Sequence, residues 1–243
     1  MNILVTGISG RMGCAVRQAV EQNPETKLAA THDSGEDLAA AMTLADAAID
    51  FSFHSFTPEL LAEAVRQHKP LVIGTTGHTP EERQAIVEAS SSIPIVFASN
   101  YSVGVNALFW LSRQAARILG DAYDIEIVEM HHHHKIDAPS GTARSLADVL
   151  RQERGYDEAD IRHGREGLVG ARPAREIGMH SLRGGDVVGD HTVIFAADGE
   201  RVELAHKASS RMTFASGAVR AALWLADKPA GLYDMEDVLG FKK

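Results

Sequence analysis

The sequence has little of several features that would mark a special class of protein. It contains one cysteine, Cys14, so an intramolecular disulfide is impossible, which fits a reducing compartment. No apolar run approaches the roughly 20 residues of a membrane-spanning helix, and the first residues resemble a strand rather than a signal peptide. Positive charge is also in deficit: the net charge of −9 argues against general binding to nucleic acid or anionic membranes. We therefore expect a cytoplasmic protein.

The composition is otherwise that of an ordinary globular protein, with 44% hydrophobic and 23% charged residues. At 243 residues the chain could form one large domain or two modest ones. Its first hundred residues alternate short apolar runs with amphipathic stretches at helical spacing. This alternation predicts a Rossmann-like α/β domain, in which helices cover both faces of a parallel sheet. We expect strands at 2–6, 27–31, 48–51, 70–73 and 93–98, and helices at 11–22, 58–67 and 80–89.

Two of these helices carry start signals. The Thr-Pro pairs at 57–58 and 79–80 each place a capping hydroxyl before a proline at the first helical position. The second pair is followed by Glu82 at N3, which completes a capping box. The stretch 33–47 is too short for more than a small helical turn between two strands.

After Tyr101 the regular alternation of short apolar runs with amphipathic stretches ends. The region 155–175 is polar and rich in arginine and glycine, which indicates a loop. Three strands then follow in succession with glycine turns at 184–185 and 198–199, which favours antiparallel pairing. We expect a second, α+β domain with a mainly antiparallel open sheet. Its elements are helix 105–119, strand 124–132, helix 141–154 and strands 177–183, 191–197 and 202–208, and a last helix at 213–225 precedes a short tail.

A glycine-rich turn separates the first expected strand from the first helix. Gly7, Gly10 and Gly13 have the spacing GxxGxxG, a variant of the dinucleotide fingerprint GxGxxG. A backbone that approaches a pyrophosphate leaves no room for a Cβ, and the helix N-terminus supplies N–H groups. Arg11 could add positive charge. The alternative is a turn that merely needs glycine, but the position between strand and helix favours a dinucleotide site.

Further candidate cofactor residues follow the expected strands at their carboxyl ends, where open α/β sheets bind ligands. Asp33 follows the second strand, where an acid would hold the adenosine ribose, although a turn aspartate is the alternative. The next residue is Ser34 rather than an arginine for a 2′-phosphate, which favours NADH over NADPH. Gly-Thr-Thr-Gly at 74–77 and Ala-Ser-Asn-Tyr at 98–101 occupy the same kind of position.

Four successive histidines at 131–134 follow an apolar strand and allow three interpretations. A solvated polar run is the simplest. A metal site is disfavoured because side chains alternate along a strand, and the neighbouring Glu129 and Asp137 give no recognised zinc spacing. We favour acid–base chemistry beside an anion site, which Lys135 and the helix start at 140–142 would provide.

The run at 129–143, Glu-x-His-His-x-His-Lys-x-Asp-Ala-Pro-Ser-Gly-Thr-Ala, resembles the signature of the 4-hydroxy-tetrahydrodipicolinate (dihydrodipicolinate) reductase family. Segments 7–13, 72–77, 100–106 and 206–211 resemble family segments in the same order. The resemblance implies an NAD(P)H-dependent oxidoreductase that reduces 4-hydroxy-tetrahydrodipicolinate, a small dicarboxylate, to tetrahydrodipicolinate in lysine biosynthesis through the diaminopimelate pathway. Another NAD(P)-dependent amino- or keto-acid dehydrogenase and a non-catalytic dinucleotide-binding sensor are the alternatives.

The resemblance also implies roles for individual residues. His131 would be the catalytic proton donor and acceptor and Lys135 the second proton-donating group, and no metal is expected. His133 would be incidental, and His134 receives no role. The substrate carboxylates would be bound by His132, Ser140, Gly141, Thr142 and Arg211. NADH or NADPH would be bound by Gly7, Ile8, Ser9, Gly10, Arg11, Met12, Asp33, Gly74, Thr75, Thr76, Ala98, Ser99, Asn100 and Tyr101.

An assembly and a domain plan follow from the same resemblance. Family members are typically homotetramers that associate through the sheets of their C-terminal domains. Their last helix usually returns to the nucleotide domain. We therefore expect a dinucleotide-binding domain at 1–102 and 212–243, and a substrate-binding and oligomerisation domain at 103–211. The chain departs from longer relatives by a shorter segment after the second strand, and from some members by Ser34 in place of an arginine.

Overall fold

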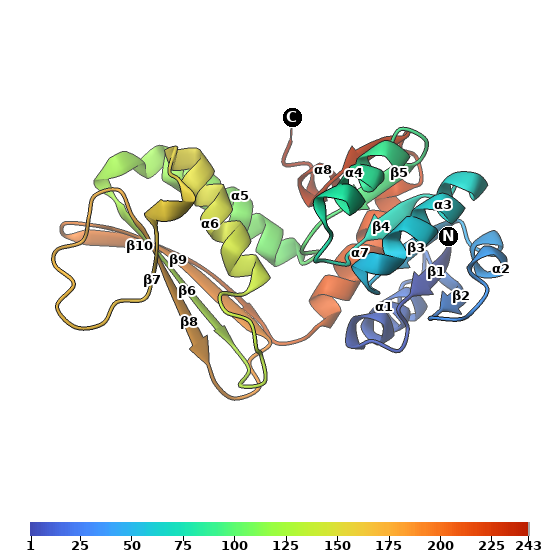
Figure 1. The fold of residues 1–243 in the computed structure, drawn as a ribbon, viewed down its shortest axis with the longest axis horizontal. Helices are drawn as coiled ribbons and strands as arrows, with labels where there is room; N and C mark the ends of the chain where they lie inside the picture. Colours follow the sequence, from blue (N-terminus) through green and yellow to red (C-terminus); the bar gives the residue numbers. More distant parts are fainter. Residues whose placement is uncertain (243) are drawn as a thin grey trace. The chain divides into compact units, whose positions relative to one another are not determined.

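The structure is a computed structural model that describes residues 1–242 (Figure 1). The chain separates into two compact units. The first contains Met1–Val103 and the described residues from Arg211 onward, so it is built from two stretches of chain. The second is the continuous stretch Gly104–Ser210. No helix within residues 1–242 combines the length and the apolar character needed to cross a membrane.

The first unit is a parallel sheet with helices on both faces. Its strands are β1 (Asn2–Thr6), β2 (Lys27–His32), β3 (Ala47–Asp50), β4 (Leu71–Ile73), β5 (Pro94–Phe97) and β11 (Gly231–Tyr233). Its helices are α1 (Arg11–Gln22), α2 (Leu38–Thr43), α3 (Thr57–Gln67), α4 (Pro80–Ala89), α7 (Met212–Leu225) and α8 (Met235–Leu239), with a 3₁₀ turn at His54–Phe56. The strand order is β11-β5-β4-β3-β1-β2, and all neighbouring pairs run parallel.

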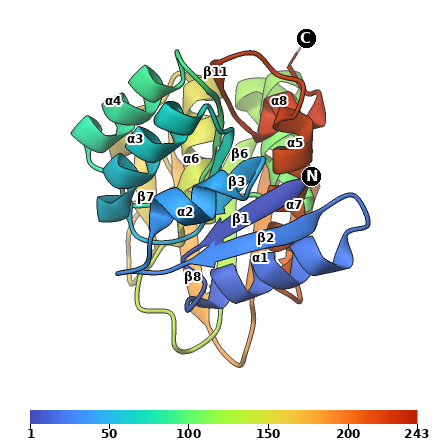
Figure 2. The same ribbon diagram turned by 90° about the vertical axis from the view of Figure 1, so that its right-hand side faces the viewer.

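Both faces of this sheet are apolar because successive residues of a strand point to opposite sides. In β1, Ile3 and Val5 pack in a cluster with α1, α7 and α8, whereas Leu4 packs in a second cluster with α2, α3 and α4. All three side chains are fully buried. Figure 2 shows α1 on one side of β1, β2 and β3 and α2, α3 and α4 on the other. The predicted Rossmann-like architecture is confirmed.

The second unit contains a five-stranded sheet in the order β10-β9-β6-β8-β7. β6 runs antiparallel to β9 and parallel to β8, and β7 runs parallel to β8. α6 packs against β6 and β8. The strands are β6 (Asp124–His131), β7 (Ile161–His163), β8 (Ile177–Arg183), β9 (Gly189–Ala197) and β10 (Glu200–Ala208). The helices are α5 (Val103–Leu119) and α6 (Gly141–Arg154), with 3₁₀ turns at Gly120–Ala122 and Glu158–Asp160.

This sheet differs from the prediction in its pairing. It is mixed rather than mainly antiparallel, because β8 runs parallel to both of its neighbours. The glycine turn at 184–185 does not close a hairpin, since β6 lies between β8 and β9. β7 lies inside the region expected to be a loop, and β11 and α8 lie inside the expected tail. These elements are three to five residues long, too short for a hydrophobic period to reveal them.

One predicted cap is also wrong. Thr57 is the first residue of α3 and Phe56 is its N-cap, so the Thr57 hydroxyl does not cap the helix. That hydroxyl instead lies 2.8 Å from Nε2 of His78, where both side chains are buried. At α4, by contrast, Thr79 and Glu82 form the predicted capping box.

Candidate functional site

Glycine is required at two positions here, one in the turn between β1 and α1 and one in the first turn of α1. Gly7 has a φ of +72°, and a Cβ there would lie 2.5 Å from the carbonyl oxygen of Phe51. A Cβ on Gly13 would lie 2.1 Å from the carbonyl oxygen of Gly7. Gly10 is the N-cap of α1, and in the described structure no side chain caps this helix and its first turn holds no acid. The backbone therefore leaves no room for side chains at these glycines, and no side chain caps the start of α1. A pyrophosphate site needs both features.

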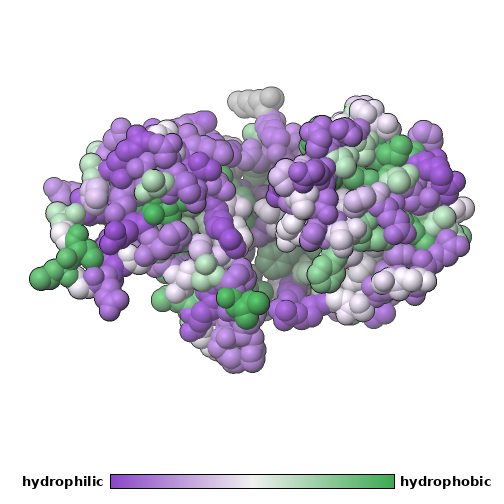
Figure 3. All heavy atoms as spheres, viewed as in Figure 1, coloured by the Kyte–Doolittle hydropathy of each residue, from purple (hydrophilic) through white to green (hydrophobic). Residues whose placement is uncertain are grey.

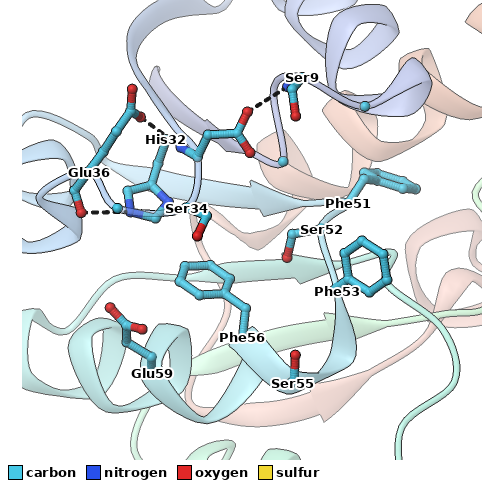
Figure 4. Close-up of a pocket in the computed structure, with 14 residues that line it drawn as sticks. Ser9, His32, Ser34, Glu36, Phe51, Ser52, Phe53, Ser55, Phe56 and Glu59 are labelled. Atoms are coloured by element: carbon cyan, nitrogen blue, oxygen red, sulfur yellow. Dashed lines mark hydrogen bonds between the residues drawn. The ribbon is translucent and has the colours of Figure 1, made fainter.

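A cavity of about 740 Å³ opens beside this turn (Figure 4). Its wall combines the glycine turn, the end of β2 and the segment from β3 into α3. The ring of Phe56 stacks on that of His32 with 5.2 Å between the centroids, and Figure 4 shows Phe56, Ser55 and Glu59 along the α3 side. The lining residues are Gly7, Ser9, Gly10, His32, Asp33, Ser34, Gly35, Glu36, Phe51, Ser52, Phe53, Ser55, Phe56 and Glu59.

The acidic part of this wall is ordered by hydrogen bonds. The Ser9 N–H donates to the Asp33 carboxylate at 2.8 Å, and the Asp33 N–H donates to the Glu36 carboxylate at 2.7 Å. Hydrogen bonding from Ser9 holds the pKa of Asp33 below its ordinary value, so this carboxylate is ionised at neutral pH. With Glu59, three carboxylates line the cavity. The wall of the cavity is therefore acidic on this side.

A buried carboxylate stands at the carboxyl end of β3. Asp50 has no exposed surface and accepts hydrogen bonds from the hydroxyls of Thr6 at 2.6 Å, Ser52 at 2.5 Å and Thr75 at 2.5 Å. The Ser52 N–H in turn donates to the Thr75 hydroxyl at 2.9 Å. One side chain thus ties together the ends of β1 and β3 and the segment after β4, at the edge of the sheet that carries the cavity.

The cavity wall contains four of the predicted cofactor residues, Gly7, Ser9, Gly10 and Asp33. Thr75 is instead buried against Asp50. Tyr101 belongs to the core: its hydroxyl donates to the carbonyls of Ile73 and Val96, and burial raises its pKa well above the ordinary value. Its side chain is therefore part of the core, and its place at a cofactor site stays a prediction. The other predicted residues lie outside the wall, at the start of α1 or after β4 and β5: Ile8, Arg11, Met12, Gly74, Thr76, Ala98, Ser99 and Asn100.

Sequence reasoning missed the aromatic wall formed by the segment after β3. The rule that pointed to the segments after β4 and β5 applies equally to this one, because all three follow parallel strands at the same edge. Gly74 matters here for a reason other than ligand approach. A Cβ on Gly74 would lie 2.3 Å from the ring of Phe51, so glycine leaves room for that ring.

A second cluster lies at the end of β6. Glu129 and His131 point to the same face because they are two residues apart, and Nδ1 of His131 lies 2.6 Å from the Glu129 carboxylate. Arg183 on β8 donates two hydrogen bonds of 2.9 Å to this carboxylate, and the Ser140 N–H donates a third at 3.2 Å. Burial would raise the pKa of Glu129, but the hydrogen bonds from Arg183 and His131 hold it below the ordinary value.

His191 on β9 completes this cluster. Its Nε2 lies 3.1 Å from the Ser140 hydroxyl, and its ring centroid lies 5.2 Å from that of His131. The Ser140 hydroxyl accepts the Ala143 N–H as the N-cap of α6, so its own proton is available to His191. Burial lowers the pKa of His191 to about 4, which keeps the ring neutral at neutral pH.

The structure distributes the other predicted residues more widely. Nζ of Lys135 lies 2.8 Å from the Asp137 carboxylate on the loop after β6. Among the histidines, His132 is half-buried, whereas His133 and His134 are exposed. Gly141 and Thr142 begin α6, whose first turn holds no acidic side chain. Arg211 belongs to the first unit, where it is the N-cap of α7. Within residues 1–242, no three His, Cys, Asp or Glu side chains are grouped so as to hold a metal ion.

Comparison with known proteins gives a consistent result along the whole chain. The family described as "Dihydrodipicolinate reductase, N-terminus" matches residues 1–101, and "Dihydrodipicolinate reductase, C-terminus" matches residues 104–239. A 4-hydroxy-tetrahydrodipicolinate reductase from Akkermansia muciniphila is 70% identical over 100% of this chain and 99% of its own length. The enzyme of the same name from an Anaeromyxobacter species is 48% identical over 100% and 98%.

A solved structure agrees at the level of the fold. The dipicolinate-bound dihydrodipicolinate reductase from a Paenisporosarcina species is 24% identical, covers 98% of both chains and superposes with a TM-score of 0.78. The two family matches cover both units, and the identities far exceed what shared architecture alone produces. The chain belongs to the dihydrodipicolinate reductase family.

Proposed function

We propose that this chain reduces 4-hydroxy-tetrahydrodipicolinate to tetrahydrodipicolinate with NADH or NADPH, as part of lysine biosynthesis through the diaminopimelate pathway. The observation that carries the proposal is the match of both halves of the chain, in order, to the two parts of the reductase family, with 70% identity to a reductase of that name. The first unit is then the dinucleotide-binding domain. The second is the substrate-binding and oligomerisation domain.

The first unit fits a dinucleotide cofactor. Gly7 and Gly13 leave the backbone room to meet a pyrophosphate, and the start of α1 offers N–H groups to it. Asp33 would accept the hydroxyls of the adenosine ribose. The three carboxylates of the cavity wall favour NADH, since a 2′-phosphate would be repelled by them. When bound, the reduced cofactor supplies a hydride.

The chain's own residues would supply the proton and bind the dicarboxylate. Reduction of the conjugated cyclic imine adds hydride at C4 and requires a proton at C3, and His131 is placed to give that proton. Lys135 would stabilise negative charge on the ring and its carboxylate and assist loss of the hydroxyl as water. The start of α6 at Ser140–Thr142, together with His132 and Arg211, would bind the carboxylates.

One assay tests this proposal directly. The aldolase product of pyruvate and aspartate semialdehyde is generated in situ, and oxidation of NADH and of NADPH is followed side by side. Turnover with either cofactor is expected, faster with NADH. Binding of NADH without turnover would point to a dinucleotide sensor. Turnover only with another amino or keto acid would point to a different dehydrogenase.

We further propose that the chain acts as a homotetramer in the cytoplasm. Exposed apolar side chains on the second unit support association. Leu182 on β8 and Val202 on β10 are exposed, and Leu168 is fully exposed. Figure 3 shows the apolar surface at the tip of the loop between β7 and β8. Light scattering on the purified protein is expected to give the mass of four chains, and the mass of one chain would contradict the proposal.

A further inference from the structure

We propose that Glu129 and Arg183 are positioning residues for the proton transfer by His131. Glu129 holds the imidazole proton on Nδ1 and leaves Nε2 as the reacting nitrogen, and Arg183 fixes the carboxylate that does so. The inference deepens the proposed function and rests on it for the role of His131. Neither residue needs to touch the substrate.

The contacts of Glu129 use both of its oxygens. One oxygen lies 2.6 Å from Nδ1 of His131 and 2.9 Å from Arg183, and the other lies 2.9 Å from Arg183 and 3.2 Å from the Ser140 N–H. The carboxylate has no exposed surface, so no water competes for these positions. An ionised carboxylate only accepts hydrogen bonds, and therefore His131 must donate from Nδ1. The hydrogen bond on one ring nitrogen determines the state of the other.

The surroundings of the other nitrogen support the same assignment. A Cβ added to Gly189 would lie 3.0 Å from Nε2 of His131, so any side chain at this position would crowd that nitrogen. Gly189 has no left-handed backbone conformation that would by itself call for glycine. The absence of a side chain at the start of β9 therefore leaves the space beside Nε2 free of a side chain from this position, whereas Nδ1 is covered by Glu129.

Arg183 has a second contact that couples the cluster to the loop after β6. Its guanidinium donates to the main-chain carbonyl of Asp137 at 2.7 Å, and the Asp137 carboxylate lies 2.8 Å from Nζ of Lys135. The strand register brings this about, because Arg183 on β8 is the direct partner of His131 on β6. Arg183 thus binds the Glu129 carboxylate, which contacts His131, and also the loop that carries Lys135.

The two residues have opposite charges, so their removal should have opposite effects on the pH profile. Loss of the Glu129 charge makes a protonated His131 less stable, whereas loss of the Arg183 charge makes it more stable. If His131 acts as the acid, activity falls at high pH as its proton is lost. Glu129 from β6 and His191 from β9 contact the His131 ring, and Arg183 from β8 binds the Glu129 carboxylate. Lys135 and Asp137 from the loop and Arg144 from α6 form a chain of ion pairs, which Arg183 joins at the Asp137 carbonyl.

The first experiment measures kcat/KM against pH for Glu129→Gln and Arg183→Met. We expect the high-pH limb to move down by about one unit or more in Glu129→Gln, and to move up in Arg183→Met. Limbs that stay in place while activity and thermal stability fall would mean a merely structural role and would overturn the proposal.

Glu126→Gln is the matched control. Glu126 lies on the same strand and, like Glu129, is paired with arginine and histidine side chains, but these are Arg165, Arg172 and His180, and none of its hydrogen bonds involves His131. The high-pH limb of kcat/KM in Glu126→Gln should lie where it does in the wild type. A limb that moves as far as in Glu129→Gln would contradict a specific role for Glu129.

A second measurement needs no turnover and so separates this inference from the proposed function. Nitrogen-15 NMR of the histidine rings in the wild-type protein at alkaline pH is expected to show neutral His131 protonated on Nδ1. In Glu129→Gln the share protonated on Nε2 should rise. A wild-type ring that carries its proton on Nε2 would overturn the inference, whatever the assay with the aldolase product gives.

Discussion

The Ser9 N–H donates a 2.8 Å hydrogen bond to the carboxylate of Asp33, which joins the glycine turn after β1 to the end of β2. The two residues are 24 positions apart in the chain, yet they share the wall of one cavity. This bond fixes the direction of the carboxylate and keeps it ionised. In the proposed cofactor site, the adenosine ribose would therefore meet a fixed negative charge.

Asp33→Asn should shift cofactor preference towards NADPH. The substitution keeps the shape of the side chain and removes the charge that would repel a 2′-phosphate. We expect the ratio of kcat/KM for NADPH to that for NADH to rise about tenfold, the scale of one hydrogen bond to a charged group. Steady-state rates with both cofactors measure it. Glu88→Gln on the exposed face of α4 changes the net charge equally and should leave the ratio unchanged.

Asp50→Ala should destabilise the first unit strongly. The substitution leaves the hydroxyls of Thr6, Ser52 and Thr75 without their buried acceptor, at a cost of roughly 3 kcal/mol or more. Denaturant unfolding measures the change. Asp46→Ala removes an exposed carboxylate that accepts the Asn2 N–H near the other end of the sheet, and it should cost much less. Equal costs for the two variants would contradict the role given to Asp50.

The long elements of the fold were predictable because each contains several repeats of its hydrophobic period. Helices α1, α4 and α6 occupy the residues that the apolar spacing and start signals indicated. The order of strands in the second sheet was not predictable in this way. β6 enters between β8 and β9, and that choice depends on packing between segments some fifty residues apart rather than on any local turn signal.

The same limit applies to the candidate site. Sequence patterns singled out His131 and Ser140, because a histidine run and a helix start are local features. Arg183 and His191 carry no local signal. They reach the cluster through strand register, since Arg183 pairs with His131 and His191 pairs with Glu129. Residues that act through pairing across a sheet become visible only when the pairing is known.

The stability of the protein should fall in mildly acidic solution because of His191. Its pKa is about 4 in the folded chain and near 6.5 in the unfolded chain, so between these values the unfolded chain binds more protons. This contribution to the free energy of unfolding is complete above pH 6.5 and disappears as the pH falls to about 4, and it amounts to roughly 3 kcal/mol at most.

His191→Gln should flatten the dependence of stability on pH between pH 6.5 and 4. Urea unfolding at several pH values measures the slope, which is informative even if the variant is less stable throughout. His134→Gln, at an exposed ring, is the matched control and should run parallel to the wild type. A slope in His191→Gln equal to that of the wild type would mean that another group causes the acid sensitivity.

His131→Gln and Lys135→Ala should differ in which kinetic constant they change. If His131 delivers a proton, its effect is confined to the transition state, so kcat should fall about 10²–10⁴-fold while KM changes little. Lys135 would meet a charged carboxylate in the ground state as well, so its removal should raise KM and lower kcat together. Steady-state kinetics separates the two effects, and thermal unfolding checks that both variants are folded under the assay conditions. An unchanged kcat in His131→Gln would remove His131 from the mechanism, and Glu129 and Arg183 would then position a histidine without a catalytic task.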